Sequence, residues 1–432
     1  MKVLICCYGS RGDVQPYIAI ATTLKRQGHQ VMLATSTRFA AHVARYDIAF
    51  GKLSDELLAI VDSPQGRAML EGTRNIVDII RINLKLAKQV KPLQQALNIQ
   101  MWQLAKTYQP DIILFHPKAA AMPDIAEKLA IPCVLATPIP MFVPTADFSL
   151  PVMPALNWLP KRLQARYRRL SFALINRLTD TAWRGYVSHL RQQLRLPAQK
   201  RYRFLTRSNG RPLLILHLHS PSLLAKPRDW PSHVRVSGYC FSDADPQWQP
   251  SESLQAFLQA GPAPVYVGFG SMAGRNPQAA ARKVIEALEL ASVRGILARG
   301  WGGLRAEDLP DSVYMVEQVP HDWLFPKVAA VVHHGGAGTT AAALRAGKPA
   351  VIVPFFGDQP FWAEQLEARG LAGTPIPYRQ LNAERLAEQI RRVTGDPAYT
   401  QRCKQLAAEL ALENGPEQVV KFLEQQLVED GA

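Results

Sequence analysis

The chain contains few cysteines, and they are scattered. Five cysteines stand at positions 6, 7, 133, 240 and 403, and their spacing does not match a metal-binding motif. This distribution disfavours a disulfide framework, so we expect a reducing, cytoplasmic environment. No apolar run reaches the roughly 18–20 residues that a membrane-spanning helix needs. The first residues, Met-Lys-Val-Leu-Ile-Cys-Cys, are typical of a strand rather than of a cleaved leader.

Acidic residues are almost missing from one long stretch. Residues 151–212 hold fourteen Lys and Arg but a single acid, Asp180. Arginines recur there near helical spacing, among leucines and aromatic residues: Arg162, Arg166, Arg169, Arg177 and Arg184. A solvated basic face, a nucleic-acid contact and an anionic membrane surface are all compatible with this pattern. Because no nucleic-acid-binding motif accompanies it, we expect no nucleic acid as a partner and favour peripheral attachment to the inner face of a membrane.

Apolar runs of strand length alternate with helical segments along both halves of the 432 residues. This alternation predicts an α/β protein with two doubly wound, Rossmann-like parallel sheets facing across a cleft. We place the first domain at residues 1–240, with the basic helical stretch at 160–211, and a linker at 241–264. The second domain is expected at 265–415 and a terminal helix at 416–432.

A glycine-rich sequence, His-Gly-Gly-Ala-Gly-Thr-Thr at 334–340, follows an apolar run and precedes a helical one. Free N–H groups and the dipole at a helix start favour phosphate there. Asp358 and Gln359 follow the next apolar run. Together they predict a site for a phosphate-bearing ligand with hydroxyl groups.

The first strand is followed by Gly-Ser-Arg-Gly-Asp-Val-Gln-Pro at 9–16. These glycines lack the G-x-G-x-x-G spacing, which disfavours a hydride-transferring dinucleotide enzyme. Asp13 stands just before a helix predicted to begin at Pro16. It is therefore either a helix cap or a chemical group at the end of the strand.

Three motifs together resemble the family 1 glycosyltransferases: the sequence at 9–16, Val-Gly-Phe-Gly-Ser-Met at 267–272, and His-His-Gly-Gly-Ala-Gly-Thr-Thr at 333–340. The pattern is most similar to the sterol glucosyltransferases and the bacterial enzymes that glycosylate lipids and antibiotics. The resemblance implies a GT-B fold, in which the first domain binds the acceptor, the second binds a nucleotide sugar, and the last helix crosses back. It also implies inversion in one displacement, with no metal and no cofactor, the nucleotide sugar being a co-substrate.

The resemblance assigns roles residue by residue. Asp13 takes the place of the catalytic histidine of the plant branch and would act as the base. The other matched positions are Ser271, His334, Gly336, Gly338 and Thr339 for the diphosphate, Asp358 and Gln359 for the sugar, and Val319 and Trp301 for the nucleotide base. His116 would lie at the edge of the acceptor site, where we favour a structural role.

These roles predict transfer of a hexose, in the first instance glucose, from a UDP-sugar to a hydroxyl of an apolar acceptor such as a sterol, terpenoid or lipid. One alternative is a soluble enzyme that moves a thymidine-linked sugar to a polyketide or macrolide. Another is a nucleotide-sugar epimerase of the same fold, which would turn over the donor without an acceptor.

Overall fold

The computed structural model describes residues 1–430 except 64–75, 157, 200, 208, 243–247, 271–275 and 300–308. The chain divides into two compact units. Of the described residues, those from 1 to 63, 76 to 242 and 413 to 430 form the N-terminal unit, and those from 248 to 412 form the C-terminal unit. Each unit holds a parallel sheet, so the predicted α/β fold with two such sheets is confirmed.

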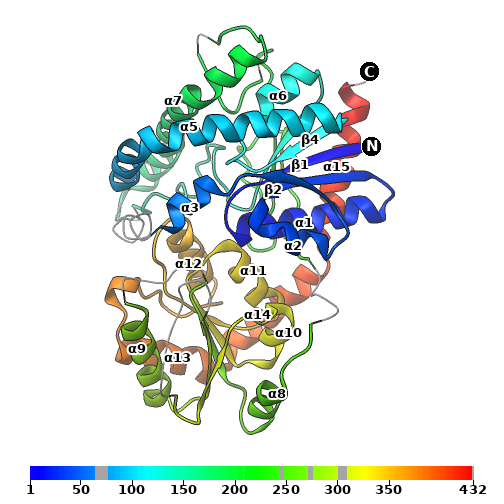
Figure 1. Ribbon diagram of the computed structural model, residues 1–432. Coiled ribbons are helices and arrows are strands. Elements are labelled where there is room, and N and C mark those ends of the chain that lie inside the picture. The colour runs from blue at the N-terminus through cyan, green and yellow to red at the C-terminus, as the bar shows by residue number, and fades with distance from the viewer. Residues whose placement is uncertain are drawn as a thin grey trace. The chain divides into compact units, whose positions relative to one another are not determined.

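The elements of the N-terminal unit alternate as expected (Figure 1). In chain order they are β1 (Lys2–Cys6), α1 (Arg11–Arg26), β2 (Gln30–Ser36), α2 (Ala40–Ala44), β3 (Ala49–Leu53), α3 (Glu56–Asp62), α5 (Ile76–Tyr108), β4 (Ile112–Phe115), α6 (Met122–Leu129), β5 (Cys133–Thr137), α7 (Lys161–Gln193), β6 (Leu214–His217), β7 (Val234–Val236) and α15 (Gly415–Asp430).

The C-terminal unit repeats the alternation on a smaller scale. Its elements are α8 (Glu252–Gln259), β8 (Val265–Gly268), α9 (Pro277–Leu290), β9 (Gly295–Ala298), β10 (Val313–Val316), α10 (His321–Leu324), β11 (Ala330–His333), α11 (Ala337–Arg345), β12 (Ala350–Ile352), α12 (Gln359–Ala368), α13 (Ala383–Gly395) and α14 (Pro397–Ala411).

The strand order of each sheet reverses once. The order is β3-β2-β1-β4-β5-β6-β7 in the N-terminal unit and β10-β9-β8-β11-β12 in the C-terminal unit. The reversals fall between β1 and β4 and between β8 and β11, and both pairs are parallel. Connections leave these neighbouring strands in opposite directions, which opens a crevice at their carboxyl ends, where such sheets bind ligands.

Helix α1 begins five residues before the predicted start, at Arg11, so Pro16 lies inside it. Ser10 precedes the helix and Asp13 occupies its first turn, where the two form a capping box. This cap starts the helix early because it satisfies N–H groups of the first turn. Pro16 removes one N–H from the following turn, at a local cost in helix stability.

The last helix packs on the first. In α15, buried Val419, Val420 and Leu423 join the core cluster that contains residues of β1 and α1. Figure 1 shows α15 in red beside the blue N-terminal elements. Within the described residues, no helix is both long and apolar enough to cross a membrane.

Candidate active site

Asp13 lies at the strand-order reversal of the N-terminal sheet, in the first turn of α1 after β1. Its Oδ2 atom accepts hydrogen bonds from the backbone N–H of Ser10 at 2.7 Å and from the Ser10 hydroxyl at 2.9 Å. The capping role expected as an alternative for Asp13 is therefore present. It fixes the carboxylate at the edge of the sheet, with 17% of its side chain exposed.

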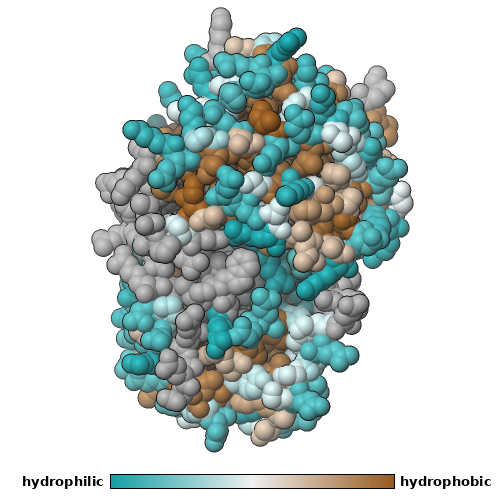
Figure 2. Space-filling view, viewed as in Figure 1, coloured by the Kyte–Doolittle hydropathy of each residue, from teal (hydrophilic) through white to brown (hydrophobic). Residues whose placement is uncertain are grey.

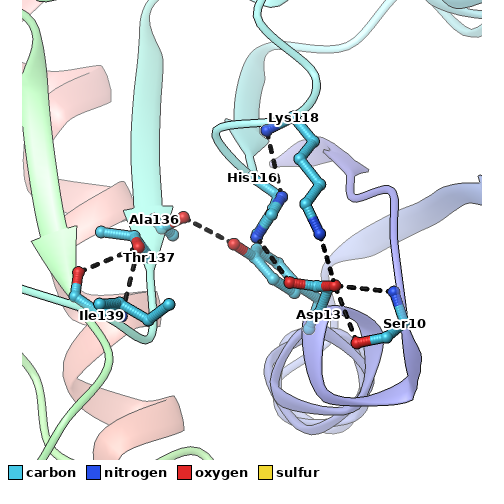
Figure 3. A network of polar contacts seen from close by, with 8 residues as sticks. Ser10, Asp13, His116, Lys118, Ala136, Thr137 and Ile139 are labelled. Atoms are coloured by element: carbon cyan, nitrogen blue, oxygen red, sulfur yellow. Dashed lines mark hydrogen bonds and ion pairs between the residues drawn. The ribbon is translucent and has the colours of Figure 1, made fainter. Parts of the chain in front are cut away.

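Two residues that follow β4 also reach this carboxylate (Figure 3). The His116 Nε2 atom lies 3.2 Å from Asp13 Oδ1, and the Lys118 Nζ atom donates to Asp13 Oδ2 at 2.8 Å. The backbone N–H of Lys118 donates to Nδ1 of His116 at 3.2 Å. Since Nδ1 accepts, Nε2 carries the ring proton and donates it to Asp13.

The charges around Asp13 favour its ionised form. Burial alone would raise the pKa of Asp13, but the Lys118 charge and the His116 hydrogen bond outweigh it and hold that pKa well below its usual range. Burial lowers the pKa of His116. The site therefore combines an ionised carboxylate, a neutral imidazole and an ammonium group.

A glycine is needed beside this carboxylate. Gly9 has φ +143°, and a Cβ atom built there would lie 2.2 Å from Asp13 Oδ2 and 2.8 Å from Lys118 Nζ. No other residue type fits, because both the backbone angle and the space exclude a side chain.

His334 marks the strand-order reversal of the C-terminal sheet. It follows β11, and a Cβ atom on Gly270, just beyond β8, would lie 3.3 Å from its ring. Gly336 is the N-cap of α11, and a Cβ atom there would lie 2.4 Å from His334 Nε2. The imidazole thus lies directly over the start of a helix.

This turn is rich in hydrogen-bond donors. The first helical bond in α11 runs from the Thr340 N–H to the Gly336 carbonyl, so the N–H groups of Gly338 and Thr339 point out of the helix start. Burial lowers the pKa of His334 to about 4, so its ring is neutral at pH 7. Its Nδ1 atom has no hydrogen-bond partner among the described residues. Such a turn can bind a diphosphate.

Asp358 and Gln359 start the neighbouring helix, α12. Asp358 Oδ2 accepts from Trp362 Nε1 at 2.9 Å, and buried Gln359 uses its Oε1 to accept the Phe355 N–H at 2.7 Å. A Cβ atom on Gly335 would lie 3.1 Å from the Gln359 carbonyl, so the two loops touch. The side-chain group of Gln359 that could meet a ligand is therefore its amide nitrogen.

Of the remaining residues predicted to bind the nucleotide sugar, the structure describes Val319. Val319 follows β10, the edge strand, and packs partly buried on the core beneath it. Ser271 and Trp301 lie outside the described residues. In the N-terminal unit, His116 was expected to be structural and Lys118 was not predicted, although both follow β4 directly.

Both units of the chain resemble known proteins. Residues 3–146 match the glycosyltransferase family 28 N-terminal domain, and residues 302–426 match the erythromycin biosynthesis protein CIII-like C-terminal domain. A sterol 3-beta-glucosyltransferase of Arabidopsis thaliana is 35% identical over 400 residues, which cover 90% of this chain and 60% of the relative. One of Saccharomyces cerevisiae is 32% identical over 97% of this chain and 34% of its own length. The chain thus spans about 60% of the plant relative.

Solved structures of similar fold are glycosyltransferases of antibiotic pathways. The glycosyltransferase of kitacinnamycin has a TM-score of 0.71 at 19% identity, with 99% of both chains covered. VinC, solved with DTDP, has a TM-score of 0.69 at 19% identity, with 99% of this chain and 100% of its own covered. The two sheets therefore define a GT-B fold. The chain belongs to the GT-B glycosyltransferase family that includes the sterol 3-beta-glucosyltransferases, which confirms the resemblance of its motifs.

Proposed function

We propose that this chain transfers glucose from UDP-glucose to the hydroxyl of a sterol or similar apolar alcohol, with inversion and without a metal. Asp13 takes the hydroxyl proton while the oxygen attacks the anomeric carbon. The bond from that carbon to the diphosphate breaks, and its electron pair leaves with the UDP. The observation that carries this proposal is the partly buried carboxylate of Asp13 at the strand-order reversal of the first sheet.

The C-terminal unit would bind the donor. The neutral His334 ring, Gly336 and the outward N–H groups of Gly338 and Thr339 would hold the diphosphate, and the helix dipole would stabilise its charge as it leaves. Ser271 would add a contact to the diphosphate. Asp358 and Gln359 would bind the sugar hydroxyls, and Val319 and Trp301 would hold the base.

The N-terminal unit would bind the acceptor. The apolar loop at 138–142 follows β5, the strand next to β4, so it lies at the same edge of the sheet as Asp13. Ile139 and Met141 in this loop are partly exposed. Apolar side chains beside a carboxylate suit a hydrophobic molecule with a hydroxyl at one end. The sterol named in the relatives' descriptions has this form.

The test is UDP release from UDP-glucose with a panel of sterols and other lipophilic alcohols. We expect acceptor-dependent release that falls at least about 100-fold in Asp13→Asn, in the range for loss of a general base. Asp147→Asn, which neutralises an exposed carboxylate of the same unit, should behave like the wild type. Release only with a thymidine-linked sugar and a soluble macrolide would contradict the donor and acceptor proposed. UDP-glucose conversion without acceptor would indicate an epimerase.

We also propose that α7 docks the protein on an anionic membrane that holds the acceptor. Leu163, Leu170, Leu174 and Leu178 are 50%, 57%, 54% and 38% exposed. They lie 7, 4 and 4 residues apart, on one side of the helix. The opposite side of α7 is buried through Phe172, Ile175, Val187 and Leu190.

Basic groups border this leucine stripe. Arg162, Arg166, Arg177 and Arg184 are exposed, and Asp180 is the only acid in α7. Figure 2 shows apolar side chains, in brown, among hydrophilic ones, in teal, on the face of the N-terminal unit in view. Leucines beside arginines suit the boundary between acyl chains and anionic headgroups, where each basic residue contributes about 1 kcal/mol.

Vesicle co-sedimentation tests the docking. Arg166→Gln/Arg177→Gln should weaken binding to phosphatidylserine vesicles roughly 30-fold, the equivalent of about 2 kcal/mol. Arg282→Gln/Arg402→Gln, which removes two exposed arginines from the C-terminal unit, is the matched control. Equal binding to neutral phosphatidylcholine, or insensitivity to salt, would contradict an anionic surface as the partner.

A further inference from the structure

Lys118 contacts the proposed base with an exposed side chain. Its Nζ atom donates to Asp13 Oδ2 at 2.8 Å, while 53% of its side chain is exposed, against 17% for Asp13. The ammonium group thus reaches a largely buried carboxylate oxygen from the solvent side. The backbone N–H of Lys118 is hydrogen-bonded to the His116 ring, which anchors the main chain of Lys118. The ammonium group itself stands on a flexible four-carbon stem.

The contacts of the Asp13 carboxylate are concentrated on one of its two oxygens. Oδ2 faces three donors, namely the Ser10 N–H, the Ser10 hydroxyl and the Lys118 ammonium, and Oδ1 faces His116. An acceptor hydroxyl must donate to this same carboxylate before its proton can be taken. A hydroxyl that approaches Oδ2 must replace one of the three donors already there.

Three of the four donors are held in place. Both Ser10 groups belong to the helix cap. His116 is buried, with its Nδ1 bound to the backbone and its ring edge against Tyr17 at 5.9 Å between ring centroids. Lys118 is the exposed donor on a flexible stem.

We propose that Lys118 is a positioning residue that occupies the place of the acceptor hydroxyl on Asp13 and is displaced when the acceptor binds. This inference rests on the proposed function, since it takes Asp13 as the base. The ammonium and the hydroxyl are both donors to the same oxygen, so the exchange keeps that oxygen hydrogen-bonded. Moving the ammonium away also makes Asp13 more basic at the moment when it must accept a proton.

Lys118 supplies the positive charge among the titratable groups described around Asp13. These groups are Cys7, Tyr17, His116 and Lys118. Burial raises the pKa of the Cys7 thiol and of the Tyr17 hydroxyl and lowers the pKa of His116, so all three are neutral at pH 7. Removing the ammonium should therefore raise the pKa of Asp13.

The first readout is the affinity for two steroids in detergent micelles, cholesterol and cholest-5-ene, which lacks the hydroxyl. We expect Lys118→Met to bind cholesterol several-fold more tightly than the wild type and cholest-5-ene equally well. Lys128→Met, which removes an exposed lysine from α6, is the matched control. Lys118→Arg should keep the wild-type difference, because it restores a cation at the same place.

The second readout is the pH profile of kcat/KM for glucosylation. In Lys118→Met the acid limb should lie at higher pH than in the wild type, as expected when a neighbouring positive charge is lost. The acceptor KM should fall. A Lys118→Met variant that matches Lys128→Met in both affinity and pH profile would overturn the proposal. Failure of the proposed function would appear instead in the wild type, as no glucosylation and no cholesterol binding, and would overturn this inference with it.

Discussion

Replacing Gly336 with alanine should weaken UDP binding by displacing His334. The added Cβ atom would lie 2.4 Å from His334 Nε2. Ordinary contact distances are about 3.5 Å, so the ring must move by about 1 Å. The backbone of Gly336, at φ −63° and ψ 142°, suits alanine, so the ring rather than the main chain must give way.

A shift of this size breaks a hydrogen bond, whose donor–acceptor distance varies over only about 0.5 Å. A hydrogen bond to a charged group contributes about 1.5–3 kcal/mol. We therefore expect Gly336→Ala to weaken UDP binding roughly 10- to 100-fold in isothermal titration calorimetry. Gly395→Ala, at a helix end where the new Cβ atom meets nothing within 4 Å, should bind UDP as the wild type does.

A double variant separates displacement of the ring from other effects. If Gly336→Ala acts through His334, adding it to His334→Ala should cause no further loss of UDP affinity, because the effects of substitutions at coupled positions are not additive. Additive losses would refute the displacement. Wild-type affinity in a folded His334→Ala variant would refute the assignment of His334 to the diphosphate.

Two further predictions concern the N-terminal unit. Arg191→Met should lower the free energy of unfolding in urea by about 3–5 kcal/mol at pH 7.5, because it leaves Asp124, 3% exposed, and Glu127 without their cation. Burial raises the pKa of Asp124 to about 6, above its unfolded value of 3.8, so protonation of Asp124 favours the folded state. The loss of unfolding free energy in Arg191→Met should therefore be smaller at pH 5 than at pH 7.5, and an equal loss at both pH values would contradict this. Gly9→Ala should abolish glucosylation while UDP affinity stays unchanged. Gly12→Ala, whose Cβ atom would come no closer than 3.9 Å to Ser10, should reduce glucosylation only mildly. An active Gly9→Ala enzyme would show that the turn tolerates a side chain.

The sequence predicted much of the fold because its strands are buried on both faces. Segments such as β4 and β5 are continuous apolar runs between polar turns. The sequence pattern predicts a helix at Met122–Leu129 and a strand at Cys133–Thr137, and α6 and β5 have these bounds. Strands β3 and β7 were not predicted. β3 has an alternating burial pattern around Gly51, and β7 has only three residues, so neither is a clear apolar run.

The position of Asp13 was predictable from its place after the first strand, but its partners were not. Whether β4 lies beside β1 depends on strand order, which periodicity does not determine. In the structure Cys6 pairs with Phe115. This register brings residues 105 positions apart, Asp13 and Lys118, into contact. The start of α1 was misplaced for a different reason: Asp13 was considered as the cap before Pro16, and the cap that Ser10 forms was not considered.

The two interpretations of Asp13, helix cap and base, are compatible in this geometry. The cap engages Oδ2 through Ser10, and His116 engages Oδ1, so the carboxylate is oriented from two sides by fixed groups. A base held in this way loses little entropy when the acceptor arrives. The cost is a carboxylate stabilised in its ionised form, which accepts a proton weakly. Displacement of the Lys118 ammonium relieves part of that stabilisation without disturbing the cap, and for this reason the pH profile of Lys118→Met is informative about the base itself.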